Sequence, residues 1–310
     1  MRLGVLDVGS NTVHLLVVDA RRGGHPSPMR SEKSVLRLAE HVDSDGLLKA
    51  EGADALVATV ALARDSARRL GCDDLLAFAT SAVRDARNSA AVLERIQADT
   101  GVDLTVLPAD AEARLTFLAV RRWFGWSAGQ LLVMDIGGGS LEIACGIDEE
   151  PDLAESLPLG AGRLTRERLD ADPPGKKVLV ALREYVDGRV ATVASRLREM
   201  PRPDRYAATS KTFRSLARLT GAAPSSAGQR APRALTIESL RQVIGFISRM
   251  SSADLAELDG VSTARAHQLL AGAIVAESTM RLCRADRVEI CPWALREGII
   301  LRRLDWLDGV

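Results

Sequence analysis

The segment Val5-Leu6-Asp7-Val8-Gly9-Ser10-Asn11-Thr12-Val13 has a counterpart later in the chain. It begins 128 residues further on and reads Val133-Met134-Asp135-Ile136-Gly137-Gly138-Gly139-Ser140-Leu141. Each copy has an apolar run that contains an aspartate, then a turn containing glycine, then a second apolar run, which predicts a β-hairpin. A shorter pair at nearly the same offset, Ala79-Thr80-Ser81 and Ala208-Thr209-Ser210, leads from a predicted strand into a predicted helix. Two matches in one register predict a duplicated α/β fold.

Helical and strand patterns alternate in the rest of the chain. Periodicity predicts helices at 53–70, 89–100, 110–123, 178–200 and 294–307, and strands at 75–79, 102–107 and 287–291. Residues 21–31 are expected to form an exposed connection and residues 222–232 a mobile loop, because both are rich in turn-forming residues.

Length and composition limit the class of protein. A chain of 310 residues exceeds the usual size of one domain, so we expect one domain at 1–120 and a second at 121–296, with helical insertions. The helix at about 297–310 is expected to pack back on the first domain. Basic and acidic residues balance at 41 each, which argues against a nucleic-acid partner.

Targeting signals and cysteine spacing give the expected compartment. No apolar run approaches the roughly 20 residues of a membrane span, so no membrane partner is expected. Asp7 comes too early for a signal peptide. The four cysteines form no CxxC pair and have no histidine at ligand spacing. These features predict a cytoplasmic protein with reduced thiols.

Both glycine turns have the chemistry of a phosphate clamp. Glycine lets backbone N–H groups approach an anion closely, and Ser10, Asn11, Thr12 and Ser140 add side-chain donors. An aspartate before each turn would repel a bare phosphate, which favours a bound Mg²⁺ or Mn²⁺ or an ordered water. An ordinary hairpin turn explains one such segment equally well, but the matched pair favours the clamp.

The two turns, together with residues 79–88, 112–115, 158–165 and 294–298, resemble the exopolyphosphatase/guanosine pentaphosphate phosphohydrolase (Ppx/GppA) family. The resemblance covers essentially the whole chain. It implies the two-domain actin-like and sugar-kinase-like superfold, with duplicated ribonuclease H-like domains and substrate in an interdomain cleft. It also implies Mg²⁺-dependent removal of terminal phosphates from inorganic polyphosphate, from guanosine pentaphosphate, or from both. Because the family often dimerises, a homodimer is expected.

The resemblance also implies site residues. Glu112 would be the catalytic base, because the family usually has two adjacent glutamates where this chain has Asp110-Ala111-Glu112. An acid in the first turn of a helix also compensates the helix dipole, which is the alternative reading. Glu142 is the second candidate, Asp135 the favoured metal ligand and Asp7 a weaker one. The implied phosphate-binding residues are Ser10, Asn11, Thr12, Arg84, Gly137, Gly138, Gly139, Ser140 and Lys211.

Departures from the family pattern leave alternatives open. Lys211 stands in what is usually a glycine-rich turn, which disfavours an ATP-dependent kinase of the same superfold because the side chain would crowd a nucleoside. A non-catalytic sensor of guanosine tetra- or pentaphosphate is a further alternative, opposed by Glu112. Larger relatives have a helical C-terminal domain that this sequence lacks, so short polyphosphate is the expected substrate. Arg163 and Arg296 are expected to be structural or rim charges, and the four histidines show no partner pattern typical of a phosphohistidine or metal site.

Overall fold

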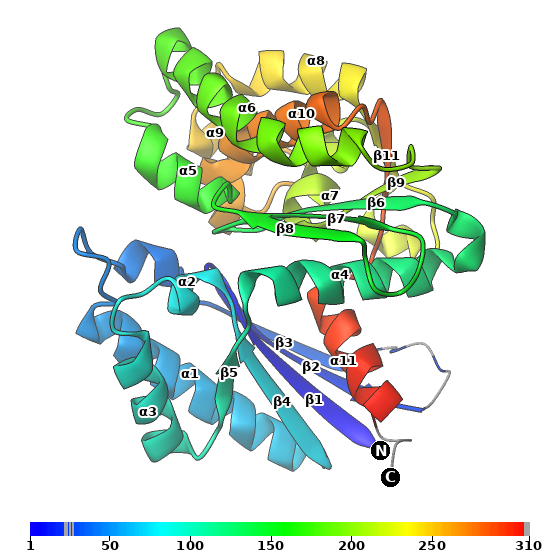
Figure 1. Ribbon diagram of the computed structural model, residues 1–310. Coiled ribbons are helices and arrows are strands. Elements are labelled where there is room, and N and C mark those ends of the chain that lie inside the picture. Colours follow the sequence, from blue (N-terminus) through cyan, green and yellow to red (C-terminus); the bar gives the residue numbers. More distant parts are fainter. Residues whose placement is uncertain (22–23, 25, 27, 307–310) are drawn as a thin grey trace. The chain divides into compact units, whose positions relative to one another are not determined.

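The computed structural model describes residues 1–21, 24, 26 and 28–306, which form two compact units (Figure 1). Unit 1 comprises Met1–Leu115 and Leu295–Val310, and unit 2 comprises Thr116–Ala294. The boundaries fall at 115 and 295, a few residues from the predicted 120 and 296. Parts of the predicted connection at 21–31 and of the predicted helices at 294–307 and 297–310 lie outside the described residues.

Unit 1 is a mixed sheet with helices on both faces. Its strands are β1 (Arg2–Val8), β2 (Thr12–Asp19), β3 (Pro28–Val35), β4 (Asp74–Ala79) and β5 (Leu104–Val106), in the order β3-β2-β1-β4-β5. Its helices are η1 (Leu38–His41), α1 (Ala50–Arg69), α2 (Ser81–Arg84), α3 (Ser89–Thr100) and α11 (Leu295–Trp306). Helix α4 (Ala109–Phe124) begins in unit 1 and ends in unit 2.

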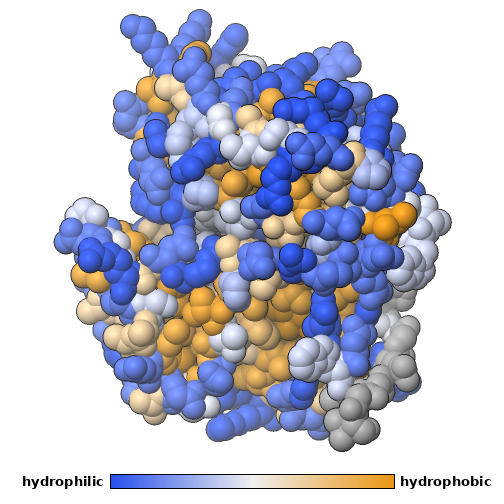
Figure 2. All heavy atoms as spheres, in the orientation of Figure 1, coloured by the Kyte–Doolittle hydropathy of each residue, from blue (hydrophilic) through white to orange (hydrophobic). Residues whose placement is uncertain are grey.

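The central strands of unit 1 are mostly apolar because both of their faces are covered. In β1, Leu6 and Val8 pack with α1 and α3, whereas Leu3 and Val5 pack with α11 on the opposite face (Figure 1). Alternation of side chains along the strand produces this division. Figure 2 shows apolar residues gathered over the sheet of unit 1, where Leu76 and other residues beside the α11 cluster are only partly buried.

Unit 2 repeats this architecture with additional helices. Its strands are β6 (Leu131–Ile136), β7 (Leu141–Gly146), β8 (Leu153–Leu157), β9 (Arg205–Thr209), β10 (Ala234–Thr236) and β11 (Arg287–Ile290), in the order β10-β11-β9-β6-β7-β8. Its helices are η2 (Trp126–Ala128), α5 (Ala161–Arg168), α6 (Lys176–Arg198), α7 (Ser210–Leu219), η3 (Ser225–Ala227), α8 (Ile237–Ile247), α9 (Ser252–Ala256), η4 (Thr263–Gln268) and α10 (Leu269–Leu282). Helix α10 is almost entirely buried.

The duplication predicted from the sequence is confirmed strand by strand. Strands β8-β7-β6-β9-β11 follow the same order as β3-β2-β1-β4-β5, with three antiparallel strands and then two parallel ones. The hairpin register matches as well, because Asp7 lies opposite His14 and Asp135 opposite Glu142. Strand β10 is an additional edge strand.

The prediction of an exposed connection was wrong for its last residues, because Pro28 begins β3. Within the described part of the chain, this edge strand pairs with β2 alone, and seven of its eight residues are exposed. An edge strand that faces solvent has no alternating apolar pattern, and proline is tolerated at its first position. Both properties concealed the strand in the sequence. Among the helices of the described residues, none has the length and apolarity to span a bilayer.

Candidate active site

The turn at 137–140 in unit 2 has its carbonyl groups occupied by the start of α5. The carbonyl of Gly137 accepts from the Ala161 N–H at 3.0 Å, and that of Gly138 from the Arg163 N–H at 2.9 Å. The Arg163 side chain donates through Nε to the carbonyl of Gly139 at 2.9 Å. Among the described residues, no acceptor meets the N–H groups of Gly138, Gly139 or Ser140. Successive unpaired amides of this kind form an anion-binding turn.

Close packing against Gly160 fixes the shape of this turn. Gly160 precedes α5, and a Cβ atom at this position would overlap the backbone of Gly139 and Ser140. Glycine is required here by the close approach of two backbones. Arg163, expected to be a structural or rim charge, braces the same turn.

Two carboxylates lie beside the turn of unit 2. Asp135 on β6 is directly opposite Glu142 on β7, so their side chains share one face of the sheet. Glu142 is 4% exposed, and its Oε1 accepts from Ser156 Oγ at 2.9 Å. Like charges placed opposite each other are unfavourable unless a cation or a proton is shared. Their oxygens are the ligand type that Mg²⁺ prefers.

The turn at 9–12 in unit 1 has the same backbone geometry. The Gly9 N–H donates to the Thr12 carbonyl at 3.0 Å, as Gly137 does to Ser140 at 2.9 Å. Ser10 and Asn11 are both buried. The Oγ atoms of Ser10 and Ser81 are 2.8 Å apart, which joins the turn to the start of α2.

Arg84 and Glu112, predicted to serve the site from separate segments, are brought together. Arg84 Nη1 lies 3.3 Å from Glu112 Oε2, and both side chains are mostly shielded from solvent. Arg84 also donates through Nε to Asp85 at 3.2 Å and through Nη1 to the Leu107 carbonyl at 3.4 Å. Within the described residues, Nη2 of Arg84 has no such contact, which leaves two donors for a ligand.

Asp7 lies beside an arginine and a histidine within unit 1. Arg296 Nη1 lies 3.4 Å from Asp7 Oδ2 and donates to Nδ1 of His14 at 2.5 Å. His14 Nε2 then carries the proton and donates to Ser31 Oγ at 2.6 Å. Burial, followed by the charges of Arg296 and Lys33, lowers the pKa of His14 to about 3. Arg296, expected to be a structural or rim charge, and His14, for which no partner was expected, thus form a hydrogen-bonded group with Asp7.

Comparison with known proteins shows the family to which the chain belongs. Residues 17–306 match the sequence model of the Ppx/GppA phosphatase family. The chain belongs to the Ppx/GppA phosphatase family. It is 62% identical over 305 residues to Exopolyphosphatase 1 of Mycobacterium tuberculosis, covering 98% of this chain and 89% of that protein. Identity to Exopolyphosphatase 1 of Mycobacterium leprae is 61%, covering 98% of this chain and 90% of that protein.

Solved structures of Ppx/GppA proteins share the fold. An exopolyphosphatase from Cytophaga hutchinsonii superimposes with a TM-score of 0.89 at 24% identity, covering 99% of this chain and 98% of that one. The structure of the Aquifex aeolicus family member superimposes with a TM-score of 0.83 at 22% identity, covering 99% of each chain. The expected α/β fold with two duplicated units is thereby confirmed.

Lys211 lies at the second position of α7, close to the turn of unit 2. The next residue, Thr212, donates through Oγ1 to the Ile136 carbonyl at 3.0 Å, which ties α7 to the end of β6. Burial lowers the pKa of Lys211, and the nearby charges of Arg214 and Arg265 lower it further. Ser210, in the turn that is usually glycine-rich in Ppx/GppA proteins, adopts φ = 91°.

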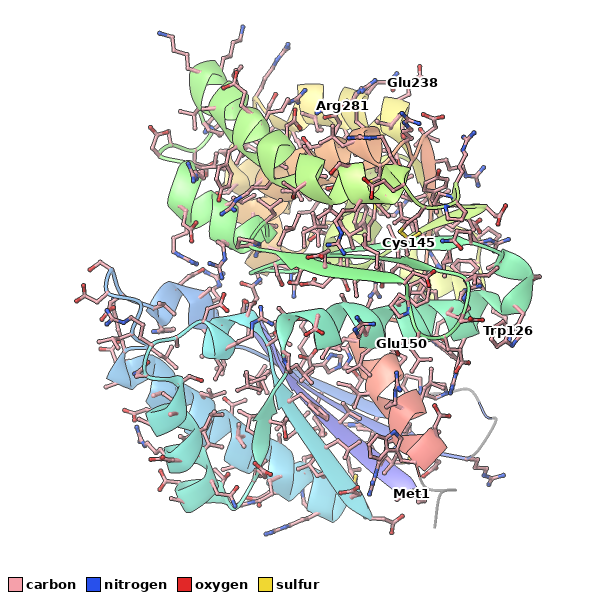
Figure 3. All side chains as sticks on the ribbon, in the orientation of Figure 1. Met1, Trp126, Cys145, Glu150, Glu238 and Arg281 are labelled. Atoms are coloured by element: carbon pink, nitrogen blue, oxygen red, sulfur yellow. The ribbon has the colours of Figure 1, made fainter. Side chains whose placement is uncertain are left out.

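The cysteines of this Ppx/GppA protein are buried or partly shielded from solvent. All four cysteines are free thiols. Cys145 is buried in β7 (Figure 3), and burial raises its pKa to about 11, which keeps it protonated. Within the described residues, no group of three or more His, Cys, Asp or Glu side chains could hold a metal ion. A Mg²⁺ site would therefore use one or two carboxylates together with substrate oxygens.

Proposed function

We propose that this chain is an exopolyphosphatase that removes the terminal phosphate of inorganic polyphosphate. The observation that carries the proposal is the anion-binding turn at 137–140, whose amides remain available while α5 holds its carbonyls. Support comes from the 62% identity to a protein named Exopolyphosphatase 1. As a member of the Ppx/GppA phosphatase family, the chain is a hydrolase of phosphoanhydride bonds.

Glu112 acts as the general base in this reaction. It accepts a proton from a water molecule that attacks the terminal phosphorus, and the bond to the bridging oxygen breaks. Orthophosphate and a chain shortened by one phosphate are released. Arg84, 3.3 Å from Glu112, orients the carboxylate and donates to phosphate oxygens through its remaining N–H groups.

The turn of unit 2 binds the charge that develops on the phosphate oxygens. The amides of Gly138, Gly139 and Ser140 are fixed in advance by α5, so they need no reorganisation during the reaction. Lys211 at the start of α7 is a further donor to phosphate in unit 2. In unit 1, Ser10, Asn11 and Thr12 of the matching turn are the corresponding donors.

Asp135, with Glu142 opposite, is the pair that would hold Mg²⁺ or Mn²⁺. The ion would neutralise charge on the phosphate oxygens. Asp7 suits a cation less well, because the Arg296 guanidinium already pairs with it at 3.4 Å. Asp135 is therefore preferred to Asp7 as the metal ligand.

Phosphate release from polyphosphate tests the role of Glu112. Glu112→Gln keeps the shape of the side chain but cannot accept a proton, so kcat should fall roughly 10²–10⁴-fold while KM holds or improves. The matched control is Asp110→Asn, which removes an exposed acid from the same helical turn. Equal activity of the two variants would make Glu112 a helix-dipole residue and direct attention to Glu142.

Metal removal and alternative substrates complete the same assay. EDTA should abolish phosphate release, and added Mg²⁺ or Mn²⁺ should restore it. Full activity without metal would show that Asp135 does not bind a catalytic metal ion.

Guanosine pentaphosphate offered in parallel tests the second activity of the family. Binding of guanosine tetra- or pentaphosphate without any phosphate release would instead favour a sensor. ATP-dependent phosphorylation of a sugar or acetate would favour a kinase.

A further inference from the structure

Helix α11 contains a glycine at a position where alanine would stabilise the helix better. Gly298 is the fourth residue of α11 and is buried. Glycine is among the poorest helix formers, so a buried glycine inside a helix needs a reason in packing. Gly188 in α6 shows the opposite case, since nothing lies within 4 Å of an added Cβ atom there.

The reason at Gly298 is a close contact with the backbone of α4 (Figure 1). An added Cβ atom would overlap the carbonyl oxygen of Leu115 and would lie 2.6 Å from its carbonyl carbon. Carbon atoms that are not bonded to each other pack at about 3.5–4.0 Å. Gly298 and Leu115 both belong to unit 1, so this contact is internal to that unit. The absence of a side chain at Gly298 therefore sets the distance between the two helices.

Helix α11 is held in place on its other sides. Ile299 and Ile300 lie in one apolar cluster with residues of β1 and β2, and Ile300 is fully buried. Arg296 pairs with Asp7 and donates to His14. A methyl group at position 298 would therefore displace α4 in preference to α11.

The part of α4 that would move carries Glu112. Leu115 lies three residues after Glu112, within one helical turn. The Glu112 N–H donates to the Pro108 carbonyl at 3.2 Å, and such bonds couple adjacent turns, so a displacement of Leu115 is passed to Glu112. Glu112 Oε2 lies 3.3 Å from Arg84 Nη1, and this pairing depends on the position of the turn.

We propose that Gly298 is a positioning residue for Glu112. The inference rests on the proposed role of Glu112 as general base. Without a side chain, Gly298 lets α4 lie close enough to α11 for the carboxylate to meet both Arg84 and the attacking water. A general base acts only within hydrogen-bond reach of the proton that it accepts, and a displacement of about 1 Å can cost about 100-fold in rate. Gly298 thus acts through α4 and not through contact with substrate.

A double-mutant cycle between residues 298 and 112 tests the proposal. Phosphate release from tripolyphosphate is measured for the full-length protein, Gly298→Ala, Glu112→Gln and the double variant. Gly298→Ala should lower kcat about 10–100-fold and change KM by less than about twofold, because the phosphate-binding turns are not displaced. In the Glu112→Gln background the same substitution should have little further effect. Equal losses in both backgrounds would overturn the proposal, since Gly298 would then not act through Glu112.

A core variant on the same helix separates position from stability. Leu304→Ala leaves a cavity in the cluster that packs α11 on the sheet, so it should lower the melting temperature. It should keep kcat, because it adds no atom between α11 and α4. A Leu304→Ala protein that loses kcat as Gly298→Ala does would overturn the proposal.

A second variant approaches the contact from the other helix and is useful if Gly298→Ala folds poorly. Leu115 packs against the apolar cluster of α11, so Leu115→Ala loosens α4 without adding an atom at the contact. Its kcat should fall while KM holds, and again only where Glu112 is present. Full kcat in Leu115→Ala would contradict the dependence of Glu112 on this contact.

The position of α4 can also be measured without turnover. In a crystal structure of Gly298→Ala, Glu112 Oε2 should lie beyond about 4 Å from Arg84 Nη1, the limit of an ion pair, while Arg296 stays paired with Asp7. An unmoved α4, or a displaced α11, would overturn the proposal. Full kcat in Glu112→Gln alone would count against the base and not against the contact, and the crystal structure would still decide whether Gly298 positions Glu112.

Discussion

Ser210 carries a backbone strain that a single substitution can reveal. Its φ of 91° is a conformation that L-residues rarely adopt. Ser210→Gly should remove strain of about 1–3 kcal/mol, against an entropic cost of about 0.5–1 kcal/mol for glycine. We expect the variant to unfold at a higher temperature, with a gain of about 1 kcal/mol.

Ser81 supplies a matched control for this prediction. It occupies the corresponding position in unit 1, and φ there is not in the positive region. Ser81→Gly also loses the hydroxyl that meets Ser10 at 2.8 Å. Thermal unfolding should therefore move in opposite directions for the two variants. Destabilisation by both would mean that the Ser210 conformation stores no strain.

His14 makes the stability of unit 1 dependent on pH. The pKa of His14 is about 3 in the folded protein, and an unfolded histidine titrates near its ordinary value of about 6.5. Below about pH 6.5 the unfolded chain therefore binds a proton that the folded chain does not. The contribution of His14 to stability is complete above about pH 6.5 and is lost as the pH falls towards 3, at up to about 1.4 kcal/mol per pH unit.

Replacement of the ring tests this assignment. His14→Gln retains an acceptor for Arg296 but cannot titrate, so the free energy of unfolding should fall less steeply between about pH 6 and 4. Denaturant unfolding across this range measures the slope. The His14 ring protons can also be followed by NMR, and a ring that titrates near 6.5 would contradict the prediction.

Site residues could be predicted from the sequence where they belong to a short motif. They could not be predicted where they depend on contacts between residues far apart in the chain. The two turns are recognisable in the sequence by their glycine and hydroxyl residues. The pairing of Glu112 with Arg84 agrees with the motifs that contain these two residues. His14 and Arg296 gave no such signal, because they are 282 residues apart. The signal that could have found His14 is the hairpin register, which places it opposite Asp7 as Glu142 is opposite Asp135.

At the scale of elements, packing against the start of α5 determines the shape of the turn at 137–140 in unit 2. Gly160→Ala should force the backbone of Gly139 and Ser140 to move, because the added methyl group has no room. We expect a loss of about 1–3 kcal/mol in stability from overpacking. kcat/KM should also fall by at least about 10-fold, since displaced amides bind developing charge poorly.

Gly188 provides the control for a glycine-to-alanine change. It lies in α6, where nothing is within 4 Å of an added Cβ atom. Gly188→Ala should keep full activity and gain about 0.5–1 kcal/mol of stability through helix propensity. A Gly160→Ala enzyme with normal kcat/KM would show that the turn tolerates displacement.

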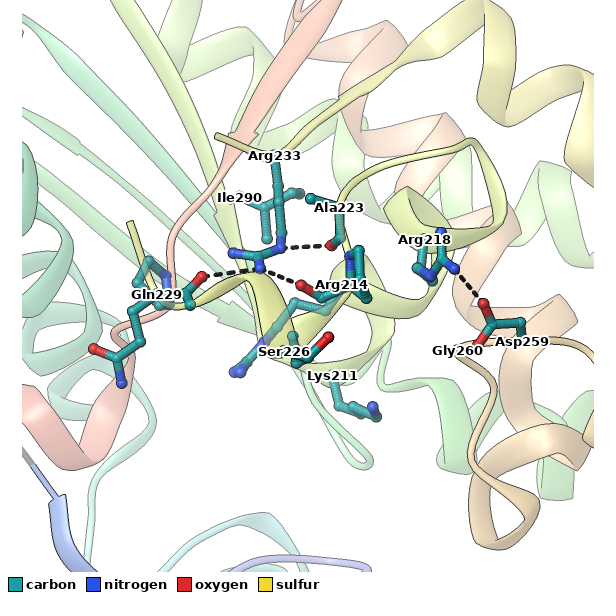
Figure 4. Close-up of a pocket in the computed structure, with 14 residues that line it drawn as sticks. Lys211, Arg214, Arg218, Ala223, Ser226, Gln229, Arg233, Asp259, Gly260 and Ile290 are labelled. Atoms are coloured by element: carbon teal, nitrogen blue, oxygen red, sulfur yellow. Dashed lines mark hydrogen bonds and ion pairs between the residues drawn. The ribbon is translucent and has the colours of Figure 1, made fainter. Parts of the chain in front are cut away.

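Elements with an apolar face were predicted well, and elements at a solvent-exposed edge were not. The helices α1 and α6 and the strand β4 follow their hydrophobic periodicity. Strand β3 was missed because it lies at an exposed edge and has no alternating apolar pattern. The loop at 222–232 is predicted to be mobile from its composition. Its hydrogen bonds to the Arg233 guanidinium, through the carbonyls of Ala223, Pro224 and Gly228, could not be inferred in that way (Figure 4).

For the whole molecule, balanced charge predicts a preference for short polyphosphate. With 41 basic and 41 acidic residues, there is no overall field to attract a long polyanion. We expect kcat/KM for tripolyphosphate to equal or exceed that for long polyphosphate, measured as phosphate release per chain. A value that rises steadily with chain length would contradict this, and the expected homodimer would be the first place to seek the additional contacts.

The route of the chain through unit 1 has a consequence for its biogenesis. Leu295, Ile299, Ile300 and Leu304 of α11 cover one face of β1 and β2, yet they are separated from these strands by the whole of unit 2. During translation, the first strands leave the ribosome long before the helix that shields them. Their apolar face is then exposed to solvent while residues 116–294 are synthesised. A chaperone that binds apolar strands would have access to this face of β1 and β2 during this interval. Docking of α11 covers the face and ends that access.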